Sequence, residues 1–305
     1  MTNAMAQVTM RTSFRPLRSA RSGLERAASA PAPTLSFAAA LLAMLASPPP
    51  AAALPDGLSA TGSGIERVET TFESVDATVS AQWEFPAHTP APLVVLIPAS
   101  EAVDRNGLPP GYGEDPATGI YAQLARKFLD AGFAVFRYDS PGTGRSSSGQ
   151  FSTVRSTALE AYTRAVDHPK VDGAHVFLLG HSASTDSVVG IYSRYAAVRP
   201  PAGVVLLASI VGETDIVRVD APVLIVVSDK TPDDLYQHGQ FPVDARSHYT
   251  QRKLETSLVT LPGAEETLLS PIDKTGGGKL YSIDPRAVSA TLEWLRARLG
   301  LPIKS

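Results

Sequence analysis

The sequence predicts an α/β fold with a mostly parallel central sheet of about eight strands flanked by helices. After residue 60, short apolar runs alternate repeatedly with segments whose apolar residues recur at helical spacing. The runs are rich in Val, Ile and Leu and lack polar alternation, which is typical of parallel strands that are buried on both faces. Proline or glycine stands at most of the junctions. These features together favour one doubly wound domain over residues 60–305.

Each expected element follows from this alternation, and no internal repeat interrupts it. The expected strands are Arg67–Phe72, Thr78–Phe85, Leu93–Pro98, Ala134–Tyr138, Val176–Leu179, Val204–Ala208, Val223–Val227 and Leu258–Leu261. The expected helices are Ile120–Ala131, Val154–Val166, Ser184–Ala197, Arg246–Leu254 and Pro285–Leu299.

Composition excludes several classes of function. A chain of 305 residues with 44% apolar and 19% charged residues can bury a large core. Its net charge of −3, without a basic run in the folded part, argues against nucleic-acid binding. It has no cysteine, so thiolate nucleophiles and disulfides are ruled out, and its six histidines show no ligand spacing. We therefore expect neither a metal nor another cofactor.

The first 53 residues differ from the rest and predict a signal peptide or an N-terminal extension. An arginine-rich segment precedes the apolar run Leu35–Ala46, and small residues up to Ala53 resemble a cleavage site. The run is shorter than the roughly 20 residues that a membrane span needs, so no stable span is expected. We expect an exported protein, periplasmic or secreted. A disordered extension or an uncleaved anchor is the alternative interpretation.

A nucleophile elbow is expected at Gly180–Ser184, with the sequence Gly-His-Ser-Ala-Ser. It follows an apolar run and precedes a helical segment, which is the context of the strand-to-helix turn that exposes a serine. The usual pattern ends in glycine, where this chain has Ser184. Ser182 is the candidate nucleophile, and the amide of Ala183 is a candidate oxyanion donor. His181 is expected to pack against the elbow and not to act as the base.

Four segments in order resemble the α/β-hydrolase fold superfamily, specifically bacterial esterases and dienelactone-hydrolase-like enzymes. They are the strand from Leu93 with its sequel Asp104–Gly107, the strand and turn Gly132–Ser146, the elbow, and the strand Ala221–Val227. The resemblance implies a serine hydrolase that acts on carboxylic esters, with a small-molecule or polymeric ester as substrate. Relatives commonly insert a helical cap after the strand ending near Ala208. Here only Ser209–Pro222 intervene, so we expect no sizeable cap and an open site.

The resemblance also suggests the remaining site residues. The second oxyanion donor is expected from the amide of Ser100 or Ala99, where the family has His-Gly. Relatives place the catalytic acid at the position of Thr231, and Asp229 is the preferred replacement, with Asp233 and Asp234 as alternatives. An acid directly after a strand is also a common turn residue.

The base departs from the family pattern. Relatives carry a histidine after the last strand, whereas this chain reads Leu-Pro-Gly-Ala-Glu-Glu over residues 261–266, with Glu266 at the histidine position. Histidine, with a pKa near 6.5, is the natural proton shuttle near neutrality, and a glutamate, ordinarily about 4.3, is a weaker base. Three hypotheses follow: Glu266 serves as the base, His238 replaces it from the long segment 230–247, or the protein is a catalytically impaired hydrolase-fold binding protein. A thioesterase or peptidase activity is a further alternative.

Overall fold

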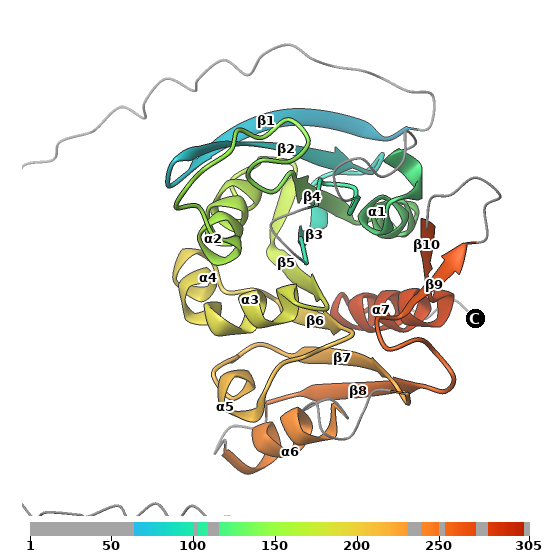
Figure 1. Ribbon diagram of the computed structural model, residues 1–305. Coiled ribbons are helices and arrows are strands. Elements are labelled where there is room, and N and C mark those ends of the chain that lie inside the picture. Colours follow the sequence, from blue (N-terminus) through green and yellow to red (C-terminus); the bar gives the residue numbers. More distant parts are fainter. Residues whose placement is uncertain are drawn as a thin grey trace, which may run out of the picture. The chain divides into compact units, whose positions relative to one another are not determined.

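Eight strands form one sheet in the order β1-β2-β4-β3-β5-β6-β7-β8 in the computed structural model (Figure 1). The structure describes residues 64–99, 103–108, 116–230, 239–249, 254–272 and 280–301. The strands are β1 (Glu66–Ser74), β2 (Ala77–Phe85), β3 (Ala91–Ile97), β4 (Ala134–Tyr138), β5 (Val171–His181), β6 (Gly203–Leu207), β7 (Val223–Ser228) and β8 (Thr256–Leu261). Strands β3 to β8 run parallel, while β2 is antiparallel to β1 and β4. The predicted mostly parallel sheet of about eight strands is confirmed.

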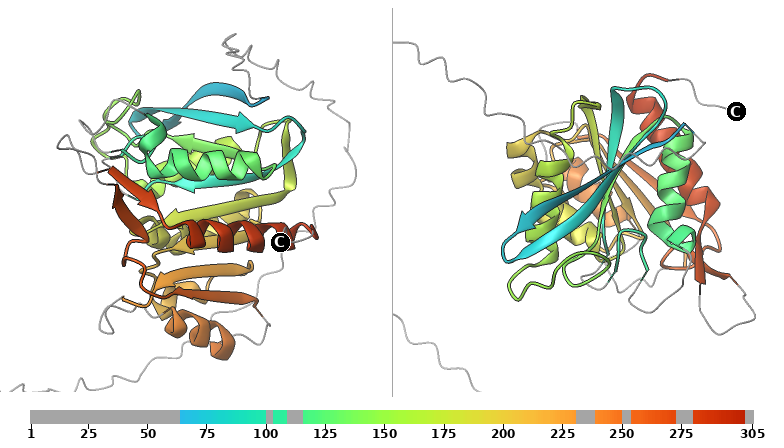
Figure 2. Two further views of the ribbon diagram at one scale, coloured as in Figure 1. Left: turned by 90° about the vertical axis from the view of Figure 1, so that its right-hand side faces the viewer. Right: turned by 90° about the horizontal axis from the view of Figure 1, so that it is seen from above.

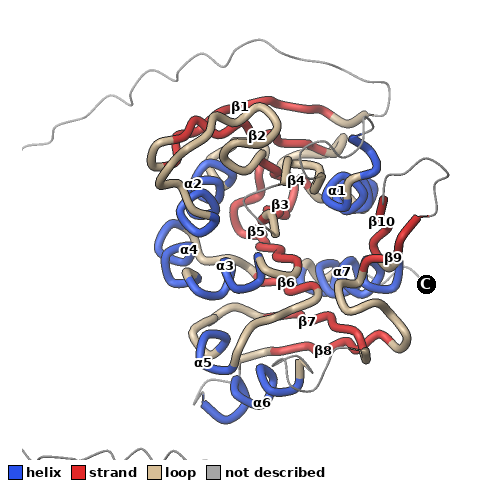
Figure 3. Tube along the Cα trace, viewed as in Figure 1, coloured by secondary structure: helices blue, strands red, loops and turns tan. Residues whose placement is uncertain are grey.

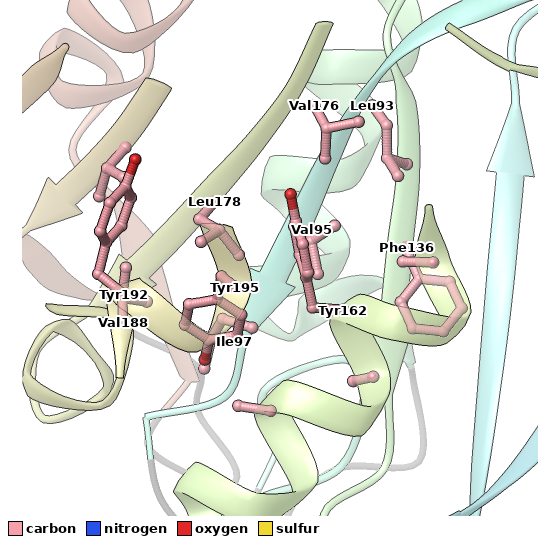
Figure 4. Packing of buried hydrophobic residues seen from close by; sticks show 14 of the residues in the cluster. Leu93, Val95, Ile97, Phe136, Tyr162, Val176, Leu178, Val188, Tyr192 and Tyr195 are labelled. Carbon is pink, nitrogen blue, oxygen red and sulfur yellow. The ribbon is translucent and has the colours of Figure 1, made fainter. Parts of the chain in front are cut away.

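Two layers of helices cover the sheet, one on each face (Figure 2). Helices α1 (Ile120–Asp130) and α7 (Pro285–Arg298) supply buried side chains to the core on one face. Helices α2 (Val154–Ala165), α3 (Ser184–Gly190) and α4 (Tyr192–Val198) supply the core on the other. Figure 4 shows this second core, where Tyr162 and Tyr195 pack at a ring distance of 5.2 Å near Val95 and Leu178 of the central strands. None of the described helices combines the length and apolar character that a bilayer crossing requires.

Two predicted helices differ from the observed ones, and one observed helix was not predicted. The expected helix Ser184–Ala197 is two helices, α3 and α4, because Ile191 between them has φ −120° and ψ 21° and does not continue the helix. The expected helix Arg246–Leu254 is α6 (Gln240–Tyr249), which begins six residues earlier and has ended before Leu254. Its Pro242 lies in the first turn, where a proline is tolerated because its missing N–H would have no partner there. A short helix, α5 (Glu213–Ile216), was not predicted.

The connection from β6 to β7 is short and carries no cap domain. It contains only α5, which lies beside α6 next to β7 and β8 (Figure 3). Arg246 of α6 is almost fully buried and donates hydrogen bonds to the carbonyls of Val219 (2.6 Å) and Ala221 (2.8 Å). Burial lowers the pKa of Arg246 to about 10. The Arg246 guanidinium thus fixes α6 beside the connection between β6 and β7. The described part of α6 packs against α5 and β8.

A hairpin of two short strands, β9 (Leu269–Ile272) and β10 (Leu280–Ile283), was also not predicted. It lies beside α1 and follows the loop that ends β8. The side-chain amide of Gln123 in α1 donates to the carbonyl of Tyr281 at 2.9 Å, which ties the hairpin to the helix layer. The chain then enters α7, whose N-cap Asp284 accepts from the amide of Arg286.

A buried ion pair joins the segment after β3 to the turn after β4. Arg105 contacts Asp139 with Nη2 to Oδ2 at 2.8 Å and Nε to Oδ1 at 3.1 Å, and its Nη1 reaches Glu69 at 2.7 Å. Asp139 also accepts the amides of Arg105 and Arg145. Burial alone would raise the pKa of Asp139, but the hydrogen bonds and charge of Arg105 hold it below its ordinary value. Two segments that the family resemblance singled out are thus bonded together.

Replacing Asp139 by asparagine should lower the free energy of unfolding by about 3–5 kcal/mol, because the buried guanidinium of Arg105 loses its buried counter-charge and keeps only the exposed Glu69. Urea denaturation of both proteins measures this loss. The matched control is Asp130→Asn, which breaks the exposed pair between Arg126 and Asp130 at 3.2 Å and should change stability by less than about 1 kcal/mol. Equal losses in the two variants would contradict the structural role of the Arg105–Asp139 pair.

Candidate active site

Ser182 lies in a left-handed turn at the carboxyl end of β5. Its φ is +54°, a conformation that non-glycine residues rarely adopt and that must be held by surrounding contacts. Its amide donates to the carbonyl of Leu207 on β6 at 2.8 Å. Its carbonyl accepts the amide of Thr185 at 3.0 Å and the Thr185 hydroxyl at 2.7 Å. This is the geometry expected of a nucleophile elbow, and Ser182 is half-buried at its apex.

The residues on either side of the turn explain how it closes. A Cβ on Gly180 would lie 3.0 Å from the backbone of Thr185, so strand and helix approach here as closely as only glycine permits. Ser184, the departure from the usual glycine, is fully buried. Its Oγ accepts the amide of His181 at 2.7 Å and donates to the carbonyl of His181 at 3.0 Å. The serine therefore fits without disrupting the turn and adds two hydrogen bonds to it.

The candidate oxyanion donors differ in their surroundings. Ala183 is exposed at the start of α3, and within the described chain its amide has no hydrogen-bond acceptor. The amide of Ala99 donates to the hydroxyl of Tyr121 at 2.7 Å, so this amide is already engaged. Burial raises the pKa of the Tyr121 hydroxyl, which stays protonated. Ser100, the other candidate, lies outside the described residues.

The candidate acid Asp229 follows β7 directly and is exposed. Its Oδ1 accepts the amide of Gly263 at 2.7 Å, so the carboxylate holds the turn after β8. The alternative acids Asp233 and Asp234 and the alternative base His238 lie outside the described residues.

The loop that carries Glu266 is bonded to the end of β7 by consecutive pairs of residues. Ser228 donates its hydroxyl to the carbonyl of Ala264 at 2.7 Å, and the Lys230 ammonium contacts the Glu265 carboxylate at 2.9 Å. Asp229 bonds Gly263 between them. Glu266 itself is exposed, and its carboxylate has no partner among the described residues. The charge of the Glu265 carboxylate is paired with the Lys230 ammonium, so Glu265 does not face Glu266 as an unpaired negative charge.

His181 connects this loop to the elbow. Its ring is buried, and Nε2 lies 2.8 Å from the carbonyl oxygen of Thr267, which can only accept a hydrogen bond. The proton therefore sits on Nε2, and the buried Nδ1 has no partner in the described part of the chain. Burial lowers the pKa of His181, so the ring is neutral at pH 7. The prediction that His181 packs at the elbow agrees with this position.

Comparison with known proteins supports the same fold. Residues 109–258, which include the elbow but not Glu266, match the sequence family described as serine aminopeptidase, S33. A dienelactone hydrolase-like promiscuous phosphotriesterase from metagenomic libraries superimposes with a TM-score of 0.55 at 16% identity, over 76% of this chain and 98% of the other. The chain has the α/β-hydrolase fold. No curated protein sequence is significantly similar to it.

Two further α/β-hydrolase-fold structures are similar at low identity. A putative α/β-hydrolase from Agrobacterium tumefaciens gives a TM-score of 0.53 at 18% identity, over 76% of this chain and 96% of its own. Dienelactone hydrolase from Anabaena variabilis gives 0.52 at 16% identity, over 77% and 98%. The resemblance to the α/β-hydrolase superfamily is thus confirmed for the fold, whereas the replacement of the family histidine by Glu266 stays a prediction.

In this α/β-hydrolase-fold protein, three loops meet at the carboxyl edge of the sheet. The elbow follows β5, Asp229 follows β7, and the loop containing Glu266 follows β8. The Ser182 hydroxyl makes no hydrogen bond to Asp229 or Glu266 among the described residues. The arrangement therefore presents a half-buried serine beside an open amide, with an unpaired carboxylate on a neighbouring loop. Within the described chain, no three His, Asp or Glu side chains converge as a metal ion would require.

A cavity of about 1230 Å³ is separate from the residues of this site. It is bounded by β1, β2, α1, α7 and the segments after β3 and β4, and neither Ser182 nor Glu266 lines it. Buried charges in its lining are paired, as in the contact between Arg137 and Glu84 at 2.5 Å. The cavity is thus a groove over a structural ion network.

Two features of the site were missed by sequence reasoning. The hydroxyl of Ser184 bonds the amide and the carbonyl of His181, a role that was not predicted. The one signal in the sequence was that a serine stands where the usual pattern has glycine. The hydroxyl of Tyr121 in α1 accepts the amide of Ala99, and no feature of the sequence predicts that bond.

Stability should depend on His181 between pH 7.5 and 5.5. Because its folded pKa lies below the unfolded value of about 6.5, the unfolded chain takes up the proton first, and stability falls as the pH drops below 6.5. The variant His181→Gln has no titratable group at this position and lacks this pH-dependent contribution to the free energy of unfolding. The difference in unfolding free energy between wild type and variant, measured by urea denaturation, should shrink at pH 5.5. An equal difference at both pH values would contradict a neutral, buried ring.

Proposed function

We propose that this protein is a serine hydrolase that cleaves carboxylic esters, small or polymeric, with Ser182 as nucleophile and Glu266 as a nonstandard base. Asp229 shapes the loop of Glu266 through the Gly263 amide. The observation that carries the proposal is the left-handed backbone of Ser182 at the carboxyl end of β5. A strained serine between a central strand and a helix is the feature that serine hydrolases of this fold use to expose the nucleophile.

The open amide beside Ser182 supports acyl transfer. Attack on an ester carbonyl places a negative charge on its oxygen, and a backbone N–H fixed nearby stabilises that charge. The amide of Ala183 meets this requirement. The amide of Ala99 does so only if its bond to Tyr121 is released, and Ser100 is the other proposed donor. One secured donor is consistent with a slower enzyme, since losing a donor typically costs about 10²–10³ in rate.

The nature of the base favours esters over amides. Cleaving an amide requires a general acid that protonates the departing amine, a task that histidine performs well near neutrality. A carboxylate is a weaker acid–base catalyst at that pH, and an alkoxide departs with less help than an amine. Esters are therefore the substrates that suit Ser182 and Glu266, although residues 109–258 match a family described as aminopeptidases.

A catalytically impaired binding protein is the second candidate. The observation that favours it is the absence, among the described residues, of any hydrogen bond between the Ser182 hydroxyl and a carboxylate or imidazole. A serine without a base is a poor nucleophile. The two candidates differ in whether Ser182 reacts with an electrophile at a measurable rate.

Export to the periplasm or the exterior is proposed from the N-terminal pattern alone. Arginines, the apolar run Leu35–Ala46 and small residues near Ala53 form the pattern of a secretory signal. The lack of cysteine suits an oxidising compartment.

A fluorophosphonate probe should label wild type and should not label Ser182→Ala. Labelling rates measured from pH 4.5 to 8 should persist below pH 6.5, where a histidine base would be protonated. Replacing Glu266 by glutamine should lower the rate by about 10²–10⁴, the usual contribution of a general base. The matched control is Glu293→Gln, which changes an exposed glutamate of α7 and should leave the rate within about twofold.

The other outcomes separate the alternatives. Labelling retained in Glu266→Gln but lost in His238→Ala would assign the base to His238. No labelling of wild type at any pH would overturn the enzymatic proposal in favour of the binding protein.

Ile210 supplies an apolar contact next to the nucleophile. Its amide donates to the Thr185 hydroxyl at 3.2 Å, and that hydroxyl donates to the carbonyl of Ser182. Ile210 is 44% exposed, unusual for a large apolar residue, and the connection between β6 and β7 that carries it contains no cap domain. We infer that Ile210 binds the apolar part of the ester.

Replacing Ile210 by alanine should lower kcat/KM for an octanoate ester by about tenfold relative to an acetate ester, because several methylene contacts worth about 0.8 kcal/mol each are lost. Hydrolysis of the two nitrophenyl esters measures the ratio. Val198→Ala is the control, since Val198 is equally exposed at 43% but ends α4 on the opposite edge of the sheet. An unchanged ratio in Ile210→Ala would place the ester elsewhere.

A further inference from the structure

His181 is the direct contact between the elbow and the loop of Glu266. His181 is the last residue of β5, and its Nε2 donates to the carbonyl of Thr267, 86 residues later in the chain, at 2.8 Å. Thr267 is the immediate neighbour of Glu266, as His181 is of Ser182. The bond therefore joins residues adjacent to the nucleophile and to the proposed base.

The backbone of His181 is itself fixed by Ser184. The Ser184 hydroxyl bonds both the amide and the carbonyl of His181, and the serine is fully buried. A glycine at position 184 would provide neither bond. The imidazole therefore projects from a backbone that is tied to the first turn of α3.

The far side of the loop is held independently. Bonds from Ser228, Asp229 and Lys230 fix residues 263–265, and the amide of Leu268 donates to the carbonyl of Glu265 at 2.8 Å. Glu266 thus stands between a segment fixed to β7 and a carbonyl fixed to His181. On this side the carbonyl of Leu268 also accepts the amide of Asp284 at 2.8 Å, but the His181 bond joins the loop to the elbow itself.

We propose that His181 is a positioning residue that, braced by Ser184, holds the loop of Glu266 against the elbow that carries Ser182. The inference rests on the proposed function, in which Glu266 is the base. A displacement of 1 Å from a reacting position can cost about 10²-fold in rate, so one hydrogen bond to the loop is enough to matter. Two departures from the family pattern, Ser184 for glycine and Glu266 for histidine, are connected through this one side chain.

His181 acts through Glu266 and does not replace it. Its Nε2 is occupied by the Thr267 carbonyl, and its Nδ1 is buried away from solvent. Serving as the base would require breaking the bond that positions the loop. Among the described residues the ring bonds the Thr267 carbonyl, whereas the Ser184 hydroxyl bonds the backbone of His181.

The test compares His181→Phe, which fills the space without a donor, with His181→Gln, which keeps an N–H donor. Fluorophosphonate labelling of Ser182 should slow at least tenfold in His181→Phe and return to within about threefold of wild type in His181→Gln. In the Glu266→Gln background, His181→Phe should cause no further loss, because the two residues act through one another. If the labelling rate of the double variant instead falls by the product of the two single losses, the proposal is overturned.

A second pair of variants covers the case in which His181→Phe does not fold. Ser184→Ala removes the brace and should slow labelling about threefold to tenfold, again only when Glu266 is present. Ser187→Ala, a buried serine one turn further along α3, should have no effect. Equal effects of the two serine variants would contradict the role of the brace.

Hydrogen exchange of residues 264–268 separates failure of this inference from failure of the proposed function. Exchange at these amides should quicken at least tenfold in His181→Phe and should not change in His181→Gln. This result is expected whether or not Ser182 is catalytically active. If wild type is not labelled but exchange quickens, the loop is positioned by His181 and the enzymatic proposal fails. If exchange is unchanged, the positioning inference fails even where labelling succeeds.

Discussion

The left-handed backbone of Ser182 is the constraint around which the carboxyl edge of the sheet is organised. Such a conformation costs a non-glycine residue roughly 1–2 kcal/mol, so it persists only where surrounding bonds enforce it. Here the bonds come from β6 through Leu207 and from α3 through Thr185, and the missing side chain of Gly180 lets the two approach. Parallel pairing of β5 and β6 therefore determines where the serine lies, and the chemistry depends on that pairing.

The second level of organisation is the set of bonds between loops. Parallel strands deliver their carboxyl ends to one edge, but they do not fix the loops that follow. In this protein, side chains after β7 bond the loop after β8, and His181 bonds the same loop from β5. The Arg105–Asp139 pair does the same for the segment after β3 and the turn after β4. These loops are thus bonded to segments of the chain other than the strands that they follow.

The sheet was predictable from sequence because burial on both faces leaves long runs of Val, Ile and Leu. All eight strands were found, with ends that differ by a few residues, most at β5, where a polar start hides the strand before Val176. The β9–β10 hairpin was missed because Leu269–Ile272 contains a serine and a proline and reads as a loop. The break at Ile191 was missed because apolar spacing continues across it.

The candidate site was predictable only where backbone geometry requires a residue type. Gly180 and Ser182 belong to a turn with a sequence pattern, so they could be placed. The bond from His181 to Thr267 joins residues far apart in the chain through a main-chain carbonyl, which any residue could supply. Nothing at position 267 could therefore signal it. The engaged amide of Ala99 escaped notice for the same reason, since its partner Tyr121 reads as an ordinary core aromatic.

The unpaired side chain of Glu266 bears on what the scaffold can carry at position 266. The backbone there is held from both sides, while the exposed carboxylate makes no hydrogen bond to a described residue. Exchange of that one side chain would therefore leave the core and the bonds between loops intact. The same architecture can carry either a carboxylate or an imidazole at this position.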